Sequence, residues 1–364
     1  MTDLRRTPLY DLHRELGARL VPFAGWEMPV QYPSGIIAEH LHCRQAAALF
    51  DVSHMGQVRV AGPEAAARFE RLVPGNIQGL KPGQARYTLF TTDQGGILDD
   101  LIVSNAGDHL FVVVNAGGRE ADLAHMRAAL EPDLEVRELA DRALLALQGP
   151  AAAAVMARLA PESAGLVFMG TAEMDVAGVP CRVSRLGYTG EDGFEISVPA
   201  GRAVELACLL LATDEVRPAG LGARDSLRLE AGLCLYGHDI DTTTTPAEAQ
   251  LGWAVQKRRR EAADFPGAEV IVRQLAEGPP RKLVGIRPEG RAPAREGTPV
   301  QAGGREVGRV TSGGFGPSVG GPVAMGYVEA ASAEPGTAVE LLVRGRPLPA
   351  TVAALPFIPH RYHR

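Results

Sequence analysis

The sequence predicts an α+β protein with a small all-β barrel or sandwich at its C-terminal end. In this chain of 364 residues, helical patterns mix with short alternating strand patterns up to about residue 276. No regular βαβ repeat with a glycine-rich first turn occurs, which argues against a doubly wound nucleotide-binding fold. From Glu277-Gly-Pro-Pro-Arg281 onward, short β-like runs are separated by glycine and proline. We therefore expect one region over residues 1–276 and a second over residues 277–364.

The helices of the first region are marked by their first turns. Thr7-Pro8 places a capping residue before a proline at the first helical position, and Gly17 ends that segment. Thr245-Pro246-Ala247-Glu248 has the form of a capping box with proline in the first turn. Periodic apolar patterns predict further helices over residues 36–49, 64–72, 120–130, 151–159, 202–211 and 223–233.

Strand patterns alternate with these helices and then replace them. In the first region, strands are predicted over residues 57–61, 97–103, 109–114, 181–184 and 194–198. In the second region, they are predicted over residues 282–286, 307–310, 323–328, 338–343 and 348–353.

The composition is that of an ordinary globular protein with a slight excess of acidic residues. The 37 Lys and Arg against 43 Asp and Glu give a net charge of −6, which argues against nucleic acid or an anionic membrane as the main partner. The 4 cysteines form no C-x-x-C pair, so we expect reduced thiols rather than a disulfide framework or a metal site. Residues 143–157, the longest mainly apolar run, are too short and broken to span a bilayer, and the first residues lack a secretory core. We expect a cytoplasmic protein, or the mature form of an organellar one.

One motif with a possible catalytic meaning is set aside. Gly316-Pro-Ser318-Val-Gly320 matches the G-x-S-x-G pattern of serine hydrolases. A nucleophile elbow needs a helix after the serine, whereas Gly320-Gly321-Pro322 starts none. We interpret this segment as a glycine-rich β turn.

Two neighbouring aspartates, Asp99 and Asp100, lie in the strand pattern that follows Gly95-Gly96. Successive side chains of a strand point to opposite faces, so one carboxylate is predicted to face inward and the other outward. An inward carboxylate usually has a partner or a chemical role, because its desolvation is costly. A turn at residues 106–108 would pair this strand with residues 109–115 and set Asp99 opposite Asn115. The alternative is an edge strand that carries two solvated charges.

A second candidate carboxylate, Glu195, follows the glycine-rich acidic turn of residues 187–193. It lies on the strand face opposite Phe194 and Ile196. If those two residues face the core, Glu195 is either solvated or an acceptor for paired N–H donors of a flat heterocycle.

The basic candidates also have two interpretations each. Arg224 and Arg228 are four residues apart and share one face of a predicted helix, and an arginine in a first turn opposes the helix dipole unless it meets a carboxylate or a ligand. Asp225 and Glu230 offer salt bridges within the same helix as the alternative. The run Lys257-Arg-Arg-Arg260 is interpreted as a solvated loop, or as an attraction for a polyanionic ligand tail or an acidic partner protein.

Taken together, several segments closely resemble the aminomethyltransferase family of the glycine cleavage system, the T-proteins. The similarity extends from Thr7 to Tyr362, and the order of the segments over the whole chain makes it specific. The segments are Phe23-Ala-Gly-Trp26, Phe50-Asp-Val-Ser-His-Met55, Gly95-Gly-Ile-Leu-Asp-Asp-Leu101, Leu147-Gln-Gly-Pro150, Gly187-Tyr-Thr-Gly-Glu-Asp-Gly193, Gly222-Ala-Arg-Asp-Ser-Leu-Arg-Leu-Glu-Ala-Gly232 and Thr311-Ser-Gly313.

This resemblance implies a three-part cloverleaf: two intertwined α+β subdomains, one of them ferredoxin-like, and a C-terminal β-barrel. It implies tetrahydrofolate as co-substrate, with neither metal nor flavin, and the lipoylated H-protein as a transient partner. The implied reaction moves the one-carbon unit of an S-aminomethyl-dihydrolipoyl arm to tetrahydrofolate. The products are 5,10-methylenetetrahydrofolate, ammonia and the dihydrolipoyl H-protein.

The resemblance also implies roles for individual residues. Asp99 matches the catalytic aspartate, which is expected to orient and help deprotonate a folate nitrogen or to stabilise cationic character nearby. Glu195 matches the position that grips the pterin, and Arg224 and Tyr362 match substrate-binding positions. The remaining matches are expected to line the pocket: Met55, Tyr87, Asn115 and Tyr188.

Two related functions stay open from the sequence. One is another folate-dependent demethylase of the same superfamily, acting on dimethylglycine, sarcosine or a sulfonium, although the first two types commonly carry a fused flavin domain that this chain lacks. The other is a non-enzymatic, folate-binding assembly factor for iron–sulfur proteins. That branch carries a K-G-C-Y-x-G-Q-E segment, which is absent from this sequence.

Overall fold

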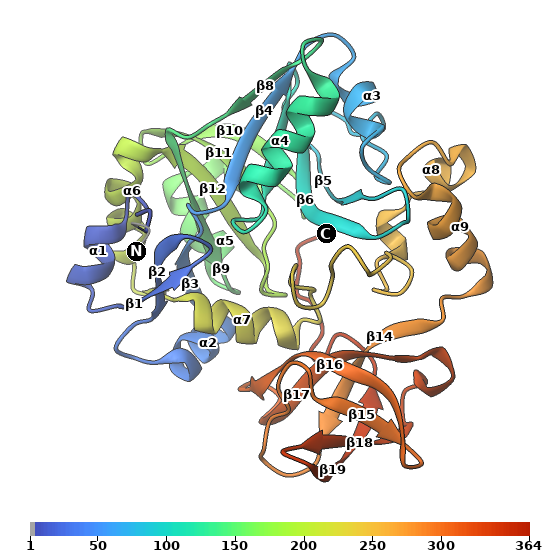
Figure 1. Ribbon diagram of the computed structural model, residues 1–364. Helices are drawn as coiled ribbons and strands as arrows, with labels where there is room; N and C mark the ends of the chain where they lie inside the picture. Colours follow the sequence, from blue (N-terminus) through green and yellow to red (C-terminus); the bar gives the residue numbers. More distant parts are fainter. Residues whose placement is uncertain (1–3) are drawn as a thin grey trace.

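A larger module of two β-sheets with covering helices stands on a closed β-barrel in the computed structural model, which describes residues 4–364 (Figure 1). The predicted α+β class and the C-terminal all-β barrel are therefore confirmed.

The first sheet of the larger module has six strands in the order β10-β11-β12-β9-β3-β13. One face packs against helices α5 and α6, where Leu145, Val155 and Leu206 belong to one buried core. The bounds are β3 Ala47–Asp51, β9 Arg142–Gln148, α5 Ala152–Leu159, β10 Thr171–Val176, β11 Val179–Ser184, β12 Gly193–Pro199, α6 Ala203–Leu211 and β13 Val216–Pro218.

The second sheet has five strands in the order β5-β6-β7-β4-β8. Its succession β4-α3-β6-β7-α4-β8 is the β-α-β-β-α-β arrangement of ferredoxin-like folds, with β5 added at one edge. On the helix-covered face, Phe69 of α3 and Met126 of α4 pack with Phe90. The bounds are β4 Gly56–Ala61, α3 Ala65–Glu70, β5 Ala85–Thr91, β6 Ile97–Asn105, β7 Leu110–Val114, α4 Arg119–Leu130 and β8 Glu135–Glu138.

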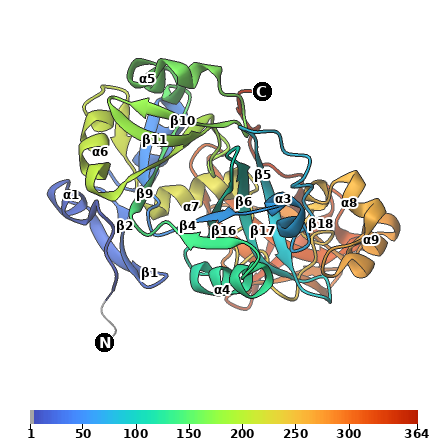
Figure 2. The same ribbon diagram turned by 90° about the horizontal axis from the view of Figure 1, so that it is seen from above.

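The two sheets are intertwined, because the whole five-stranded sheet is inserted between β3 and β9 of the other. These two strands pair antiparallel, with Ala48 opposite Gln148. The faces not covered by α3 to α6 meet each other, and Phe50, Phe111 and Leu144 share a core there. Seen from above in Figure 2, α5 and α6 lie beyond one sheet and α3 and α4 beyond the other.

Helix α7 occupies the centre of the molecule and contacts α2, β2 and the barrel strand β16. The hairpin β1–β2 and helices α1 and α2 complete the larger module, and α8 and α9 lead to the barrel (Figure 1). The bounds are α1 Tyr10–Glu15, β1 Arg19–Phe23, β2 Trp26–Gln31, α2 Ile36–Gln45, α7 Leu221–Glu230, α8 Lys257–Ala262 and α9 Ala268–Glu277.

The barrel closes in the order β14-β17-β16-β15-β18-β19 around its own apolar core. After it, the chain returns to the larger module: Phe357 N donates to Glu230 O at 3.0 Å and Arg361 N to Gly190 O at 2.8 Å. The bounds are β14 Arg281–Pro288, β15 Pro299–Ala302, β16 Arg305–Gly316, β17 Gly321–Glu329, β18 Ala338–Val343 and β19 Arg346–Ala353.

The segment Gly316-Pro-Ser318-Val-Gly320 joins β16 to β17, as the turn interpretation predicts. Ser318 N and Ser318 Oγ do meet an acid and a histidine: the amide donates to Glu230 Oε1 at 2.7 Å, and Oγ lies 2.9 Å from His40 Nε2. Glu230 Oε2 lies 3.0 Å from the same His40 nitrogen, whereas a catalytic triad places the acid on the other one. This group of side chains therefore joins α2, α7 and the barrel.

Three helix predictions need correction. Thr7 does not cap a helix, because α1 begins only at Tyr10 after Leu9, and the Thr7 hydroxyl donates to Asp51 Oδ2 at 2.6 Å instead. The helix predicted over residues 36–49 ends at Gln45, and all five residues of β3 that follow are buried, because an apolar run suits a central strand as well as a helix. The capping box forms, with Glu248 Oε2 accepting from Thr245 N at 3.0 Å, but only a turn follows. Gln250 at φ 59° lies in the left-handed region and ends the helical path.

The basic run of residues 257–260 is not a solvated loop. It forms the start of α8, and the Arg259 side chain is buried. Arg259 Nη2 donates to Glu70 O at 2.9 Å, and Arg258 pairs with the Glu70 carboxylate. These arginines therefore attach α8 to α3.

Candidate active site

Asp99 and Asp100 point to opposite faces of β6, and neither faces bulk solvent. Asp99 pairs with Phe90 on the face covered by α4, and its side chain is fully buried. Asp100 pairs with Leu89 on the other face, which looks toward α7 and the six-stranded sheet. Since β6 lies between β5 and β7, the alternative of an edge strand with two solvated charges is wrong.

One amide holds both aspartates. Asn115 Nδ2 donates to Asp99 Oδ1 at 2.8 Å and to Asp100 Oδ1 at 2.7 Å, and Asp100 N donates to Asp99 Oδ1 at 2.8 Å. The strand register predicted from the sequence, with Asp99 opposite Asn115, is off by one residue. Leu101 pairs with Val114, so Asp100 is the residue in line with Asn115.

The electrostatics of this pair suit a group that exchanges protons near neutral pH. Burial, followed by the negative charge of Asp99, raises the pKa of Asp100 to about 7. Burial also raises the pKa of Asp99, and the hydrogen bond from Asn115 is among the causes that lower it. A carboxyl group with a pKa close to the working pH is well matched to general acid–base catalysis.

Two tyrosines lie on the Asp100 side of the sheet. Burial, then the charge of Asp100, raises the pKa of Tyr87 well above its usual value, so this hydroxyl stays a neutral donor. The Tyr87 ring lies 5.2 Å from the ring of Trp253, which is 60% exposed, so this edge of the site reaches the surface. The Tyr188 hydroxyl donates to the carbonyl oxygen of Cys234.

Arg224 and Arg228 differ in what they bind. Arg228 donates to Asp225 at 2.8 Å and to Asp239 at 2.6 Å, so the interpretation as a structural salt bridge holds for this residue. Arg224 lies over the Tyr188 ring at 4.9 Å, and its Nη1 is buried without a hydrogen-bond partner. Arg224 is therefore the arginine of this helix that is available to an anionic or carbonyl group.

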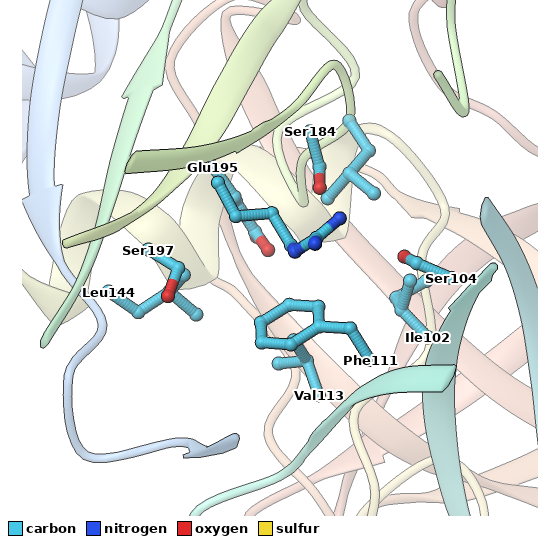
Figure 3. A pocket seen from close by; sticks show the side chains of 10 residues that line it. Ile102, Ser104, Phe111, Val113, Leu144, Ser184, Glu195 and Ser197 are labelled. Atoms are coloured by element: carbon cyan, nitrogen blue, oxygen red, sulfur yellow. The ribbon is translucent and has the colours of Figure 1, made fainter. Parts of the chain in front are cut away.

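Glu195 faces the other sheet rather than solvent, and its side chain is buried. It lines a cavity with Ser184 and Ser197 on one wall and Ile102, Ser104 and Phe111 on the other (Figure 3). The cavity has a volume of about 10 Å³, which is space for about one water, so it is at most part of a site for a ring-sized ligand.

No hydrogen bond within residues 4–364 uses the Glu195 carboxylate. Burial raises its pKa, and the charge of Arg224 lowers it. Phe194 and Ile196 do face the core, as the sequence analysis supposed. The alternative of a solvated Glu195 fails because a second sheet covers the opposite face.

The last two candidates lie at the border of this arrangement. Met55 packs beside the core that the two sheets share. Tyr362 stacks on Phe168 with 4.1 Å between ring centroids, and burial raises its pKa to about 12. The next backbone contact, Arg361 N to Gly190 O, brings this tail to the loop that carries Tyr188.

Two residues of the site were missed. Asp122 of α4 is buried next to Asp99, and an acid on the apolar face of an amphipathic helix was a signal in the sequence. His54 follows the Asp51-Val-Ser segment, and burial lowers its pKa to about 4, with the charge of Arg224 among the lesser causes. The ring is therefore neutral near pH 7, and its Nδ1 is buried without a hydrogen-bond partner among residues 4–364.

Residues 4–364 contain no group of three His, Cys, Asp or Glu side chains arranged to hold a metal ion. Over the same residues, no helix is both long enough and apolar enough to cross a bilayer.

Two family models match the chain in the order of its two parts. The model described as the GCVT N-terminal domain covers residues 9–259, and the glycine cleavage T-protein C-terminal barrel domain covers residues 281–358. Fold, site and matches together define a protein of the class of one-carbon transferases built from these two domains.

Relatives from distant organisms cover almost the whole chain. The chain is 52% identical over 376 residues to the mitochondrial aminomethyltransferase of Gallus gallus (99% of this chain, 94% of that protein) and 51% identical over 370 residues to that of Homo sapiens (99% and 91%). The solved structure of the glycine cleavage system aminomethyltransferase T from Bartonella henselae matches with a TM-score of 0.93 and 46% identity, covering 99% of this chain and all of that one. The chain belongs to the glycine cleavage T-protein family, and it is an enzyme of the aminomethyltransferase type.

Proposed function

We propose that this aminomethyltransferase uses tetrahydrofolate as co-substrate and receives the aminomethyl group from the lipoylated H-protein. The observation that supports a folate site best is the pair of Glu195 and Arg224. Their side chains are close enough for each charge to shift the pKa of the other, and Arg224 Nη1 is buried with no hydrogen-bond partner among residues 4–364. A carboxylate suits the 2-amino and ring N–H donors of a pterin.

In this proposal Glu195 binds the pterin, while Arg224 and Tyr362 bind or orient the rest of the folate. Met55, Tyr87, Asn115 and Tyr188 line the pocket. The closed cavity beside Glu195 means that lining side chains move when the ring enters, since its volume of about 10 Å³ is far below the size of a pterin.

For this reaction the protein must align the aminomethyl group with the folate and supply one well-placed carboxylate. Two bonds of the S–CH2–NH2 group break, C–N with release of ammonia and C–S with release of the dihydrolipoyl thiol, while two folate nitrogens each form a bond to the carbon. The two protons that these nitrogens lose end on the ammonia and on the thiol, and a carboxylate can take up the first of them from the attacking nitrogen. We propose the Asp99–Asp100 pair for this proton. The resemblance assigned it to Asp99, but Asp100 is the member on the face toward Tyr87, Tyr188 and α7, with Asp99 behind it.

The test is an assay with lipoylated H-protein that carries the aminomethyl group, with and without tetrahydrofolate. Ammonia and methylenetetrahydrofolate should form only when both are present. Turnover of dimethylglycine, sarcosine or a sulfonium instead would favour the demethylase alternative, and folate binding without any turnover would favour the assembly factor.

Glu195→Gln gives the matching test of the site. The amide keeps the size of the side chain but loses the charge-assisted acceptor, so folate affinity should fall by about 1.5–3 kcal/mol, or roughly 10- to 100-fold. Glu205→Gln, at an exposed carboxylate of α6 that pairs with Arg202, is the control. Equal affinity of wild type and E195Q would remove Glu195 from the folate site.

The mitochondrial names of the relatives leave two locations for this chain. We infer that it acts wherever the H-protein and folate pools meet, in a bacterial-type cytoplasm or in the mitochondrial matrix. Fractionation of the source cells, followed by the ammonia assay above, tests this.

A further inference from the structure

A third carboxyl group stands behind the two aspartates of β6. Asp122, in the first turn of α4, is 4% exposed, and its Oδ2 is buried without a hydrogen-bond donor. The same holds for Oδ2 of Asp99, which is fully buried. Two buried carboxylate oxygens without donors need an explanation, because each such group costs free energy.

The two oxygens converge on Gly118. A Cβ placed on this residue would lie 2.0 Å from Asp99 Oδ2 and 3.0 Å from Asp122 Oδ2. Gly118 has an ordinary φ of −90°, so its backbone does not require glycine. The missing side chain is needed for space, and that space lets the two carboxyl groups approach each other.

Among residues 4–364, no positive charge acts on Asp122 as a counterion. The charged groups that act on it are Asp99 and Asp100 of β6, both acids. Tyr236, in the loop after α7, faces the same aspartates. Burial raises the pKa of Tyr236 most, and the charges of these aspartates raise it further. On α4 itself, His125 lies one turn further and contacts Phe90 at 5.0 Å between rings.

We propose that Asp122 is a positioning residue that keeps its proton and donates it in a hydrogen bond to Asp99 Oδ2. Two facing carboxyl groups without a cation share a proton, because both cannot ionise at low cost. Consistent with this, burial and then the charge of Asp99 raise the pKa of Asp122 to about 9. The proposal rests on the role proposed above for the Asp99–Asp100 pair.

The hydrogen bond from Asp122 to Asp99 also affects Asp100, on the other side of the sheet. With a donor on each oxygen, Asp122 on Oδ2 and Asn115 on Oδ1, Asp99 stays ionised and fixed. Its negative charge is, after burial, the main cause that raises the pKa of Asp100 to about 7. Asp122 therefore sets the proton affinity of Asp100 through Asp99, without touching substrate.

The first test compares Asp122→Asn with Asp122→Ala in the pH dependence of kcat. In wild type, kcat should fall on the acid side as Asp100 takes up a proton. Asn still donates to Asp99 Oδ2, so D122N should keep this acid limb. Ala removes the donor, Asp99 becomes protonated and loses its charge, and the limb should move to lower pH by about one unit.

A role in folding alone predicts another result. It would lower the amount of active protein in D122A without moving the limb, so an unmoved limb in D122A, or an equal shift in both variants, overturns the proposal. Thermal unfolding of both variants gives the folded fraction.

The second test needs no turnover. The infrared difference spectrum between wild type and D122N at neutral pH should show the carbonyl band of one neutral carboxylic acid in wild type. The infrared difference spectrum between D100N and the double variant D100N/D122N should contain the same carboxylic acid band. A spectrum without this band overturns the proposal. If the band is present and the enzyme does not transfer one-carbon units, the proposed function fails while the shared proton stands.

Discussion

Two of the groups of buried charged side chains in this protein are built in opposite ways. The Glu230 cluster joins the barrel to the larger module: Glu230 binds His40 at 3.0 Å, Arg44 at 3.3 Å and Ser318 N at 2.7 Å. The aspartate cluster, Asp99, Asp100 and Asp122, has Asn115 as its donor and lies among other acids.

The difference is visible in the proton affinities. Burial alone would raise the pKa of Glu230, but the hydrogen bond and charge of His40, with help from Ser318, lower it to about 2. In the aspartate cluster burial is not compensated, and the pKa of Asp100 rises to about 7 and that of Asp122 to about 9. In the balanced cluster Glu230 stays ionised over the physiological range and stabilises a junction. An unbalanced one is costly to bury and can exchange protons.

The largest effect should come from breaking the unbalanced cluster. Asp100→Asn removes the proton acceptor and should lower kcat by about 10²- to 10⁴-fold, while folate binding stays close to wild type. Asp99→Asn, which the sequence resemblance marks as the catalytic change, should reduce kcat less, because this side chain faces α4. Steady-state rates and folate titrations of both variants test this. A larger loss of kcat in D99N than in D100N would return the role of proton acceptor to Asp99.

Breaking the balanced cluster should affect stability instead. Glu230→Ala leaves the buried His40 without its carboxylate partner and removes one of the two carboxylates that pair with Arg44, which should cost about 3–5 kcal/mol of unfolding free energy. Denaturant unfolding measures this. Glu205→Ala at an exposed pair with Arg202 is the control, and it should cost no more than about 1 kcal/mol. A loss in E230A as small as in this control would show that the junction does not depend on the cluster.

The two clusters should also respond to pH with opposite sign. Glu230 has a lower pKa folded than unfolded, so its contribution is present above about pH 5 and is lost as pH falls toward 2. Asp122 has a higher pKa folded, so its contribution is present below about pH 4 and is lost as pH rises toward 9. Unfolding free energies of wild type, Glu230→Gln and D122N over this range measure both slopes, and parallel curves for all three would contradict the assignment.

The smallest expected effect separates the two arginines of α7. Arg224→Gln removes a guanidinium whose Nη1 has no partner, so stability should change by less than about 0.5 kcal/mol and folate affinity should fall about tenfold. Arg228→Gln leaves Asp239 without its partner and should destabilise the protein without a specific effect on folate. Thermal unfolding and folate titration of the pair test this, and the reverse pattern would exchange their roles.

Local signals in the sequence predicted most helices of the larger module and the barrel strands other than β15. They failed where contacts with distant parts of the chain decide whether a segment becomes a helix or a strand. The apolar run that becomes β3 is a strand only because β9 and β13 flank it, and the capping box at Thr245 forms without a helix because Gln250 turns the chain.

The site was predictable in its residue types more than in their directions. Alternation along β6 shows that Asp99 and Asp100 diverge, but which face is covered by helices depends on the position of α4. Likewise, the strand pattern around Glu195 places it opposite the core, and only the second sheet shows that this face is also buried. Long-range packing supplies this information, and no local pattern encodes it.

The insertion of one sheet into the other has a consequence for how the chain is made. The five-stranded sheet is complete at Glu138, whereas β3 must wait for β9, which begins at Arg142, before its first antiparallel partner exists. During synthesis, the inserted unit can therefore fold while the residues on both sides of it are still without partners. We expect nascent chains that end soon after Glu138 to protect β4 to β8 from proteolysis and to leave β3 accessible to chaperones.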